Sequence, residues 1–158
     1  ARAVWLDYCE CKMIDTIARE PLWHHLINYR CGTGHSVSFV GNVHEGPHAL
    51  NSRNTTRMRP GMVVTDEPGV YETDLVGIRI ENELVCVHKA DNQYGTFLGF
   101  EPIMFVPIAT SPIVPGVLTK DELDWLNNYH RQVFEKLAPR LNDEEREWLA
   151  KKCAAIGC

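Results

Sequence analysis

Three glycine- and proline-bearing segments between residues 32 and 81 constrain this chain more than any other feature. The first joins Gly-Thr-Gly-His at 32–35 to Val-His-Glu-Gly-Pro at 43–47; the others are Glu-Pro-Gly at 67–69 and Gly-Ile-Arg-Ile-Glu-Asn at 77–82. Each places an imidazole or a carboxylate beside residues that free or fix the backbone. The order His, His, Glu, Glu is typical of a metal site rich in carboxylates. We therefore expect these segments to converge in the folded chain.

Size and charge exclude several classes of protein. The chain has 158 residues, 44% of them hydrophobic, which is enough for one ordinary core. Its 16 basic and 21 acidic residues are interspersed, so no basic stripe is available to bind nucleic acid. No apolar run approaches the roughly 20 residues needed to span a bilayer, and no secretory leader is present. We expect a cytoplasmic protein, and the opening at Ala1 agrees with a fragment.

The six cysteines match neither a zinc ribbon nor a disulfide scaffold in their spacing. Cys9 and Cys11 suggest a soft-metal pair, but no second pair of Cys or His lies at a usable distance. We therefore expect reduced thiols.

The periodicity predicts a mixed α and β fold. Apolar residues recur at spacings of three to five over residues 7–27, which favours an amphipathic helix interrupted near Pro21. Residues 61–88 change to a β pattern, broken at 68–69, and further short strands are predicted at 97–100 and 103–106.

The last part of the chain reads as helical. Thr119 has the spacing of an N-cap with an acidic first turn, and Pro139 ends the helix that follows. A further helix is predicted from Asn142 towards Lys152.

Alternation in residues 78–81 predicts a strand with Arg79 and Glu81 on one face and two isoleucines on the other. We expect the surroundings of Glu81 to be buried, and Arg79 to pair with a carboxylate and keep it ionised. Pairing with the strand before Glu67 would bring both glutamates together, where they repel unless a cation lies between them. The alternative is two ordinary surface glutamates and a surface cation.

His35 stands apart from the other histidines because Gly32 and Gly34 bring its backbone close to a site and leave the imidazole free to coordinate. The remaining histidines outside the first segment are interpreted as ordinary surface or core residues, with His48 near enough to line a cleft: His24, His25, His48, His88 and His130.

On these motifs the chain resembles the Xaa-Pro aminopeptidases, the aminopeptidase P branch of the pita-bread metallopeptidases, which also include prolidase, methionine aminopeptidase and creatinase. The resemblance extends over nearly the whole chain. It implies an α+β fold in which residues 1–107 form the C-terminal part of a pita-bread domain, with a curved antiparallel sheet backed by helices. Residues 108–158 would form a helical C-terminal extension that packs on the same domain.

The resemblance also implies roles for individual residues. His35, Glu67 and Glu81 look like metal ligands, with Glu81 bridging two metals and Glu67 also handling the proton of the attacking water. His44 is similar to the cleft histidine that contacts the substrate and stabilises the transition state, and Arg79 joins the catalytic set. The substrate would be a proline-containing peptide that loses its N-terminal residue.

Two divalent cations are implied for the intact enzyme. A site of carboxylates and one imidazole favours Mn²⁺, with Zn²⁺ or Co²⁺ as alternatives. The family's two aspartate ligands come earlier than anything in this chain, so we expect the fragment alone to be inactive and its site empty or partly occupied. A homodimer is expected for the intact enzyme, with no nucleic-acid or membrane partner.

The chain departs from the family pattern at the first motif. The family usually reads His-Gly-Thr-Gly-His-Gly-Val-Gly, whereas residues 31–38 read Cys-Gly-Thr-Gly-His-Ser-Val-Ser. Cys31 thus takes the place of a substrate-pocket histidine, and a thiol cannot supply an imidazolium. Two alternatives remain open: a prolidase that takes only dipeptides, and a pita-bread protein-binding module without catalytic activity.

Overall fold

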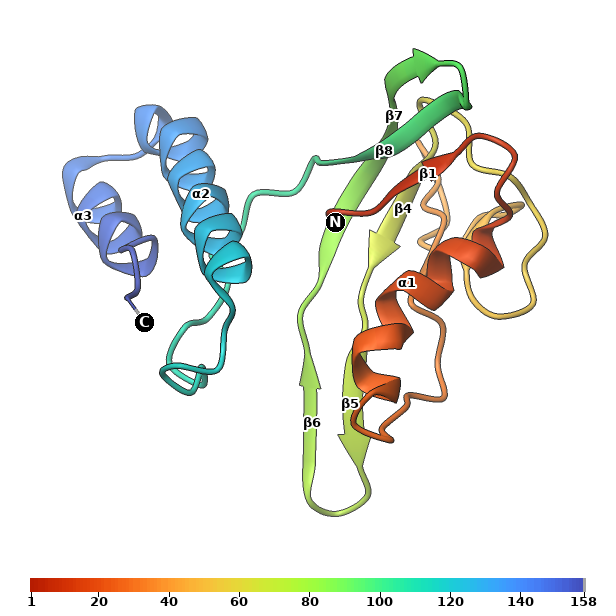
Figure 1. Ribbon diagram of the computed structural model, residues 1–158. Helices are drawn as coiled ribbons and strands as arrows, with labels where there is room; N and C mark the ends of the chain where they lie inside the picture. Colours follow the sequence, from red (N-terminus) through yellow and green to blue (C-terminus); the bar gives the residue numbers. More distant parts are fainter. Residues whose placement is uncertain (158) are drawn as a thin grey trace. The chain divides into compact units, whose positions relative to one another are not determined.

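The computed structural model of the protein describes residues 1–157, so Cys158 lies outside the described part. The chain divides into two units, Ala1–Met104 and the residues from Phe105 onward, which are described separately (Figure 1). The first is a β-rich unit with one helix, and the second is helical. The predicted mixed α+β class is confirmed. The predicted boundary at residue 107 and the packing of the extension on the domain stay predictions.

A four-stranded antiparallel sheet forms the centre of the first unit, in the order β1-β8-β7-β4. Its strands are β1 (Val4–Leu6), β4 (Val63–Asp66), β7 (Asn82–Asn92) and β8 (Gly95–Pro102). Trp5 lies opposite Leu98, and Val64 lies opposite Leu84, which fixes the register across the sheet. Because β4 and β7 are adjacent, the residues that follow β4 lie near those that precede β7.

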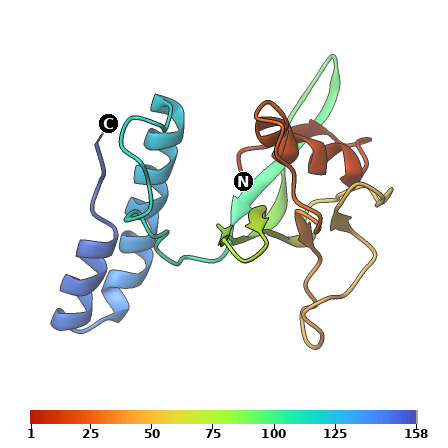
Figure 2. The same cartoon turned by 90° about the horizontal axis from the view of Figure 1, so that it is seen from below.

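Two short antiparallel ladders adjoin this sheet. β2 (Gly34–His35) pairs with β3 (Ala49–Leu50), and β5 (Gly69–Glu72) pairs with β6 (Val76–Arg79). The long loop that joins β2 to β3 extends away from the sheet in the view of Figure 2. The predicted β pattern over 61–88 therefore has a second interruption, at residues 80–81 between β6 and β7, and the predicted strand at 103–106 is wrong.

Helix α1 (Cys11–Trp23) packs on one face of the sheet through Cys11 and Ile14. Its core partners are buried side chains of the sheet and the adjoining ladders: Trp5, Leu50, Met58, Val64, Leu84, Cys86, Leu98 and Phe100. The prediction that Pro21 interrupts this helix is wrong, because Pro21 lies within its last turn. Pro21 removes the hydrogen bond that an N–H at this position would donate to the Ile17 carbonyl, but the helix continues to Trp23, two residues beyond it.

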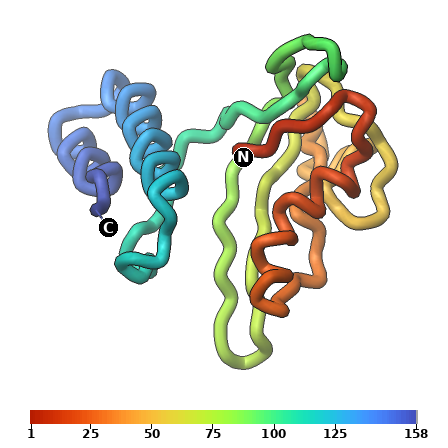
Figure 3. Tube along the Cα trace, viewed as in Figure 1, coloured from red at the N-terminus to blue at the C-terminus, as the bar shows by residue number. Residues whose placement is uncertain are grey.

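The second unit contains α2 (Lys120–Leu137), a short 3₁₀ turn (Ala138–Arg140) and α3 (Asp143–Lys152), which Figure 3 traces in blue. The predicted N-cap at Thr119 is confirmed by a complete capping box. Asn142, from which a further helix was predicted, also forms a complete capping box. Tyr129, Val133 and Leu149 form the buried core between the helices. No helix within residues 1–157 has the length and apolar character needed to cross a membrane.

Candidate metal centre

His35 is placed by a close backbone approach between β2 and β4. A Cβ atom on Gly34 would lie 1.8 Å from the carbonyl oxygen of Thr65, so only glycine fits at this position. The backbone N–H of His35 donates a hydrogen bond to Thr65 Oγ1 at 3.0 Å. The imidazole is 23% exposed and therefore accessible from one side.

Glu67 follows β4 and points its carboxylate at His35. Its backbone N–H donates to the carbonyl oxygen of Thr33 at 2.7 Å, which fixes the start of the Glu-Pro-Gly turn. Its Oε1 accepts a hydrogen bond from Thr65 Oγ1 at 3.0 Å and lies 3.2 Å from His35 Nε2. The Thr65 hydroxyl therefore bonds to both residues: it accepts from the backbone N–H of His35 and donates to the carboxylate of Glu67.

Arg79 joins the two glutamates. Its Nε lies 3.3 Å from Glu81 Oε2, and its Nη1 lies 3.6 Å from Glu67 Oε2. The predicted pairing of Arg79 with a carboxylate is confirmed. The Glu81 carboxylate, followed by the Tyr71 phenol, raises the pKa of Arg79, so this cation stays charged and offsets the repulsion between the carboxylates.

The expected burial around Glu81 is wrong. Ile78 and Ile80 are each 54% exposed. The physical reason is that β6 pairs only with β5, and every residue of β6 is exposed in the described part of the chain. Glu81 itself is 36% exposed and has Arg79 as its ion-pair partner.

His44 lies against His35 although nine positions of loop separate them. Their ring centroids are 3.9 Å apart in an edge-on arrangement, with an interplanar angle of 68°. The two ends of the loop are tied together because Glu45 N–H donates to the Ser36 carbonyl at 3.3 Å and Ser36 Oγ donates to the Glu45 carbonyl. The serine that replaces a family glycine thus takes part in holding the loop that carries His44.

Cys31 is exposed and lines a different hollow of about 660 Å³. Its carbonyl oxygen accepts a hydrogen bond from Arg19 Nη2 at 2.8 Å. Arg30 and Arg53 line the same hollow, so the thiol stands among cationic side chains. Among the predicted site residues, His35 thus contacts Glu67 and His44, and Glu81 is linked to Glu67 only through Arg79. Cys31 lies apart from them.

The assembled donors suit a divalent cation in type. One imidazole and two carboxylates are the ligand set that Mn²⁺ and Zn²⁺ accept. Across residues 1–157, however, no three or more His, Cys, Asp or Glu side chains are arranged as a preformed cation site. The Arg79 guanidinium lies between the two carboxylates and supplies the positive charge that they require. The residues fit a metal by their chemistry, and a cation would compete with Arg79 for the same oxygens.

The other histidines have ordinary surroundings. His24 and His88 are exposed and pair with Glu20 and Asp91, whereas His48 is buried with Nε2 hydrogen-bonded to the Val63 carbonyl. In the helical unit, burial lowers the pKa of His130, and its Nε2 accepts from Ile108 N–H at 3.1 Å.

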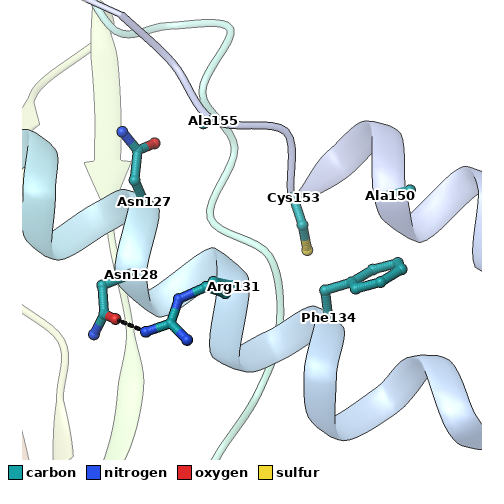
Figure 4. Close-up of a pocket in the computed structure, with 7 residues that line it drawn as sticks. All are labelled: Asn127, Asn128, Arg131, Phe134, Ala150, Cys153 and Ala155. Carbon is teal, nitrogen blue, oxygen red and sulfur yellow. Dashed lines mark hydrogen bonds between the residues drawn. The ribbon is translucent and has the colours of Figure 1, made fainter.

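The helical unit has a pocket of its own, of about 530 Å³. Figure 4 shows the Cys153 side chain beside the Phe134 ring and a hydrogen bond from Arg131 to Asn128. The lining contains amide, arginine, apolar and thiol groups but no carboxylate. It therefore lacks the donors of the site in the first unit.

Sequence reasoning missed four residues around the site. Thr33 and Thr65 hold the backbone and carboxylate positions, and the ion pair of Asp15 and Arg19 lies beneath them. The i, i+4 spacing of Asp15 and Arg19 in a predicted helix was the available signal. Nothing in that spacing indicated that the pair would be buried.

The chain is similar to known proteins in sequence. Residues 4–88 match the metallopeptidase family M24, and residues 96–156 match the C-terminal region of peptidase M24. A probable Xaa-Pro aminopeptidase P of Coprinopsis cinerea is 41% identical over 152 residues, covering 91% of this chain and 24% of that protein. Aminopeptidase P2 of Arabidopsis thaliana is 44% identical over 144 residues, covering 87% of this chain and 20% of that protein. The chain therefore spans about a quarter of the length of the curated relatives that it matches.

Solved structures with a similar backbone are also peptidases of this kind. X-prolyl aminopeptidase from Caenorhabditis elegans, described as a cytosolic enzyme with a di-nuclear active site, superposes with a TM-score of 0.88 at 37% identity, over 99% of this chain and 26% of that one. The pita-bread fold class is thereby confirmed. An Xaa-Pro dipeptidase from Bacillus anthracis gives a TM-score of 0.51 at 27% identity, over 65% of this chain and 26% of that one.

Proposed function

Because the chain belongs to metallopeptidase family M24, we propose that it forms part of an Xaa-Pro aminopeptidase, which removes the N-terminal residue from peptides with proline in second position. One observation carries the proposal. His35 Nε2 lies 3.2 Å from Glu67 Oε1, and Arg79 forms ion pairs with both Glu67 and Glu81. The curated relatives that match over most of this chain are aminopeptidases of this kind. This chain spans about a quarter of the length of these relatives, so the activity is proposed for the whole protein.

His35, Glu67 and Glu81 would hold the cations, of which we propose two, with Mn²⁺ favoured over Zn²⁺ and Co²⁺. When bound, such cations activate water and polarise the scissile carbonyl. The resemblance places two further aspartate ligands outside these 158 residues. Arg79 would release the carboxylates to the cations while remaining close enough to keep them ionised.

Glu67 is the proposed proton carrier. Its Oε1 is already fixed by the Thr65 hydroxyl, and its carboxylate is 19% exposed, so one oxygen can be reached by water. A carboxylate within hydrogen-bond reach can take the proton of the attacking water and pass it to the leaving amine. His44 is exposed beside His35 and is proposed to donate to the oxygen on which negative charge develops.

We propose that Cys31 binds the substrate more weakly than a histidine at this position would. A neutral thiol is a poor hydrogen-bond donor compared with an imidazolium, so a substrate carboxylate or carbonyl would be held less firmly. We therefore propose that the substrate affinity of this protein is lower than that of relatives with histidine there.

The aminopeptidase is favoured over prolidase by the extent of the match. The C. elegans aminopeptidase aligns with 99% of the chain, including the helical unit, whereas the Bacillus dipeptidase aligns with 65%. A binding module without catalytic activity is less favoured because His35, Glu67 and Glu81 are all retained. A cytoplasmic location and a homodimer complete the proposal, the first supported by the cytosolic C. elegans neighbour.

A chimera tests the proposal. This chain would replace the matching 26% of the C. elegans enzyme, and hydrolysis of an Xaa-Pro peptide would be measured with Mn²⁺. We expect metal-dependent turnover, and a loss of at least ~100-fold on Glu67→Gln. Glu72→Gln, an exposed glutamate in the adjacent strand β5, is the matched control and should leave turnover unchanged.

Turnover of the Glu67→Gln chimera within a few-fold of the parent would mean that Glu67 does not carry the proton. A folded chimera that hydrolyses nothing would contradict the proposed activity, and one that also fails to bind Mn²⁺ would favour the binding module.

A further inference from the structure

Thr33 is connected to both metal-ligand segments through its backbone. It is 1% exposed. Its N–H donates to the Leu50 carbonyl at 2.7 Å, and its carbonyl oxygen accepts from Glu67 N–H at 2.7 Å. His35 follows two residues later and returns to the same place, because its N–H donates to Thr65 Oγ1. Thr33, His35, Thr65 and Glu67 therefore form a closed ring of covalent and hydrogen-bonded links.

The side chain of Thr33 ties this ring to helix α1. Thr33 Oγ1 donates to Asp15 Oδ1 at 2.5 Å, and the Tyr29 hydroxyl, also at 2.5 Å, donates to Thr33 Oγ1. Asp15 is 1% exposed, so its carboxylate is removed from solvent. A buried carboxylate must be satisfied by several donors.

Arg19 supplies the remaining donors. Its Nε lies 2.8 Å from Asp15 Oδ2, and its Nη1 and Nη2 donate to the carbonyl oxygens of Tyr29 and Cys31 at 2.7 and 2.8 Å. The guanidinium also stacks over the Tyr29 ring at 4.0 Å. Arg19 is 6% exposed. One side chain thus holds the carboxylate and the backbone leading into the Gly-Thr-Gly-His motif.

A buried ion pair of this kind is an inefficient way to stabilise a fold. Desolvation of two charges offsets most of their attraction, and apolar residues of similar volume serve as well or better. The hydrogen bonds around Asp15 and Arg19 are directional, because each of them joins a defined donor to a defined acceptor. The network therefore specifies a geometry.

We propose that Asp15 and Thr33 are positioning residues for the metal centre, holding the backbone of His35 and the backbone of Glu67 at a fixed separation. The inference rests on the proposed function for the nature of the site. It goes beyond that proposal because neither residue is among the proposed metal ligands, and both act through the ligands they position.

The test uses the 158-residue chain and a near-isosteric substitution. Thr33→Val keeps the shape and removes the hydroxyl, and Thr33→Ser restores it. Hydrogen exchange of the Glu67 and His35 amides, measured by NMR, should accelerate about 10-fold in Thr33→Val and return towards the parent rate in Thr33→Ser. The Leu84 amide, in the central sheet, should change much less.

Thr96→Val is the matched control. It removes a threonine-to-aspartate hydrogen bond of the same kind, since Thr96 Oγ1 donates to Asp91 Oδ1 at 2.8 Å in the β7–β8 hairpin. Exchange at Glu67 and His35 should be unaffected by it. A purely structural role of the Thr33 network would instead accelerate exchange across the sheet, Leu84 included, and would overturn the proposal.

Mn²⁺ affinity supplies a second readout that needs no catalysis. Free Mn²⁺ measured by electron paramagnetic resonance should show about 10-fold weaker binding to Thr33→Val and no change with Thr96→Val. His35→Ala should remove the binding. If His35→Ala leaves Mn²⁺ binding intact, the proposed function fails while the exchange result still decides the positioning role. If His35→Ala removes binding but Thr33→Val changes neither affinity nor exchange, the positioning role fails alone.

A measurement on the unmodified chain covers the case in which Thr33→Val does not fold. The denaturant dependence of exchange should be the same for the Thr33 and Glu67 amides and for Arg19 Nε–H, because they open as one unit. Independent opening of the Glu67 amide would contradict the proposal.

Discussion

Replacing Gly34 with alanine should destabilise the first unit and separate His35 from Glu67. The added Cβ would lie 1.8 Å from the Thr65 carbonyl oxygen and 2.7 Å from its carbonyl carbon. Ordinary contacts need roughly 3.5 Å, so β2 must move from β4 by about 1.5 Å or more. That movement breaks the bonds from His35 N–H to Thr65 and from Glu67 N–H to Thr33. With about 1 kcal/mol for each bond and the cost of overpacking, we expect a loss of about 3 to 5 kcal/mol.

Urea unfolding of the 158-residue chain measures this loss, followed through the NMR signals of Leu84 and Cys86 in the central sheet. Gly77→Ala in β6 is the control, because its Cβ would meet only the edge of the Tyr71 ring at 3.3 Å. That ring can move, so the control should lose less than about 1 kcal/mol. Equal losses for the two variants would refute the close-approach argument.

Three further predictions follow from the site and its surroundings. The 158-residue chain alone should show no Xaa-Pro hydrolysis with Mn²⁺, because the aspartate ligands are missing; hydrolysis that His35→Ala abolishes would contradict this. In the chimera, Cys31→His should lower KM with little change in kcat, and an unchanged KM would remove Cys31 from the substrate pocket. Burial, followed by the Cys11 thiol, raises the pKa of Cys86 from 9.0 to about 11. The thiol is neutral in both states below about pH 8, but at higher pH the unfolded chain ionises first, so stability falls. Between about pH 8 and pH 11 the parent should lose about 2 kcal/mol more than Cys86→Ala, and parallel urea titrations of the two would contradict the assignment.

Local signals predicted the elements that depend on local chemistry. The capping boxes at Thr119 and Asn142 are satisfied within four residues, so the helices they begin were readable from the sequence. Pro21 was misread because α1 accommodates the proline in its last turn, with the loss of one backbone hydrogen bond, and ends two residues later. The strand predicted at 103–106 failed because Ile103 and Val106 are exposed and Phe105 packs against the core of its own helical unit without joining a ladder.

The sequence motifs predicted which side chains lie together in the site, but they did not predict which of its residues are buried. The alternation of residues 78–81 predicted that Arg79 and Glu81 share a face, and their 3.3 Å contact agrees. The same alternation suggested burial of the isoleucines, which depends on what covers β6 and cannot be read from β6 itself. The link from Asp15 through Thr33 to Glu67 spans more than 50 positions, and only the three-dimensional fold brings its parts together.

His35, Glu67 and Glu81 are proposed to bind a divalent cation. Paramagnetic broadening by sub-stoichiometric Mn²⁺ in NMR spectra of the chain tests it most directly, because broadening falls steeply with distance from the ion. We expect the signals of His35, Glu67 and Glu81 to broaden first, and the signals of Arg79 to shift as its carboxylate partners bind the cation. Broadening centred on the acidic first turn of α3 (Asp143, Glu144 and Glu145) instead, with His35 unaffected, would contradict it.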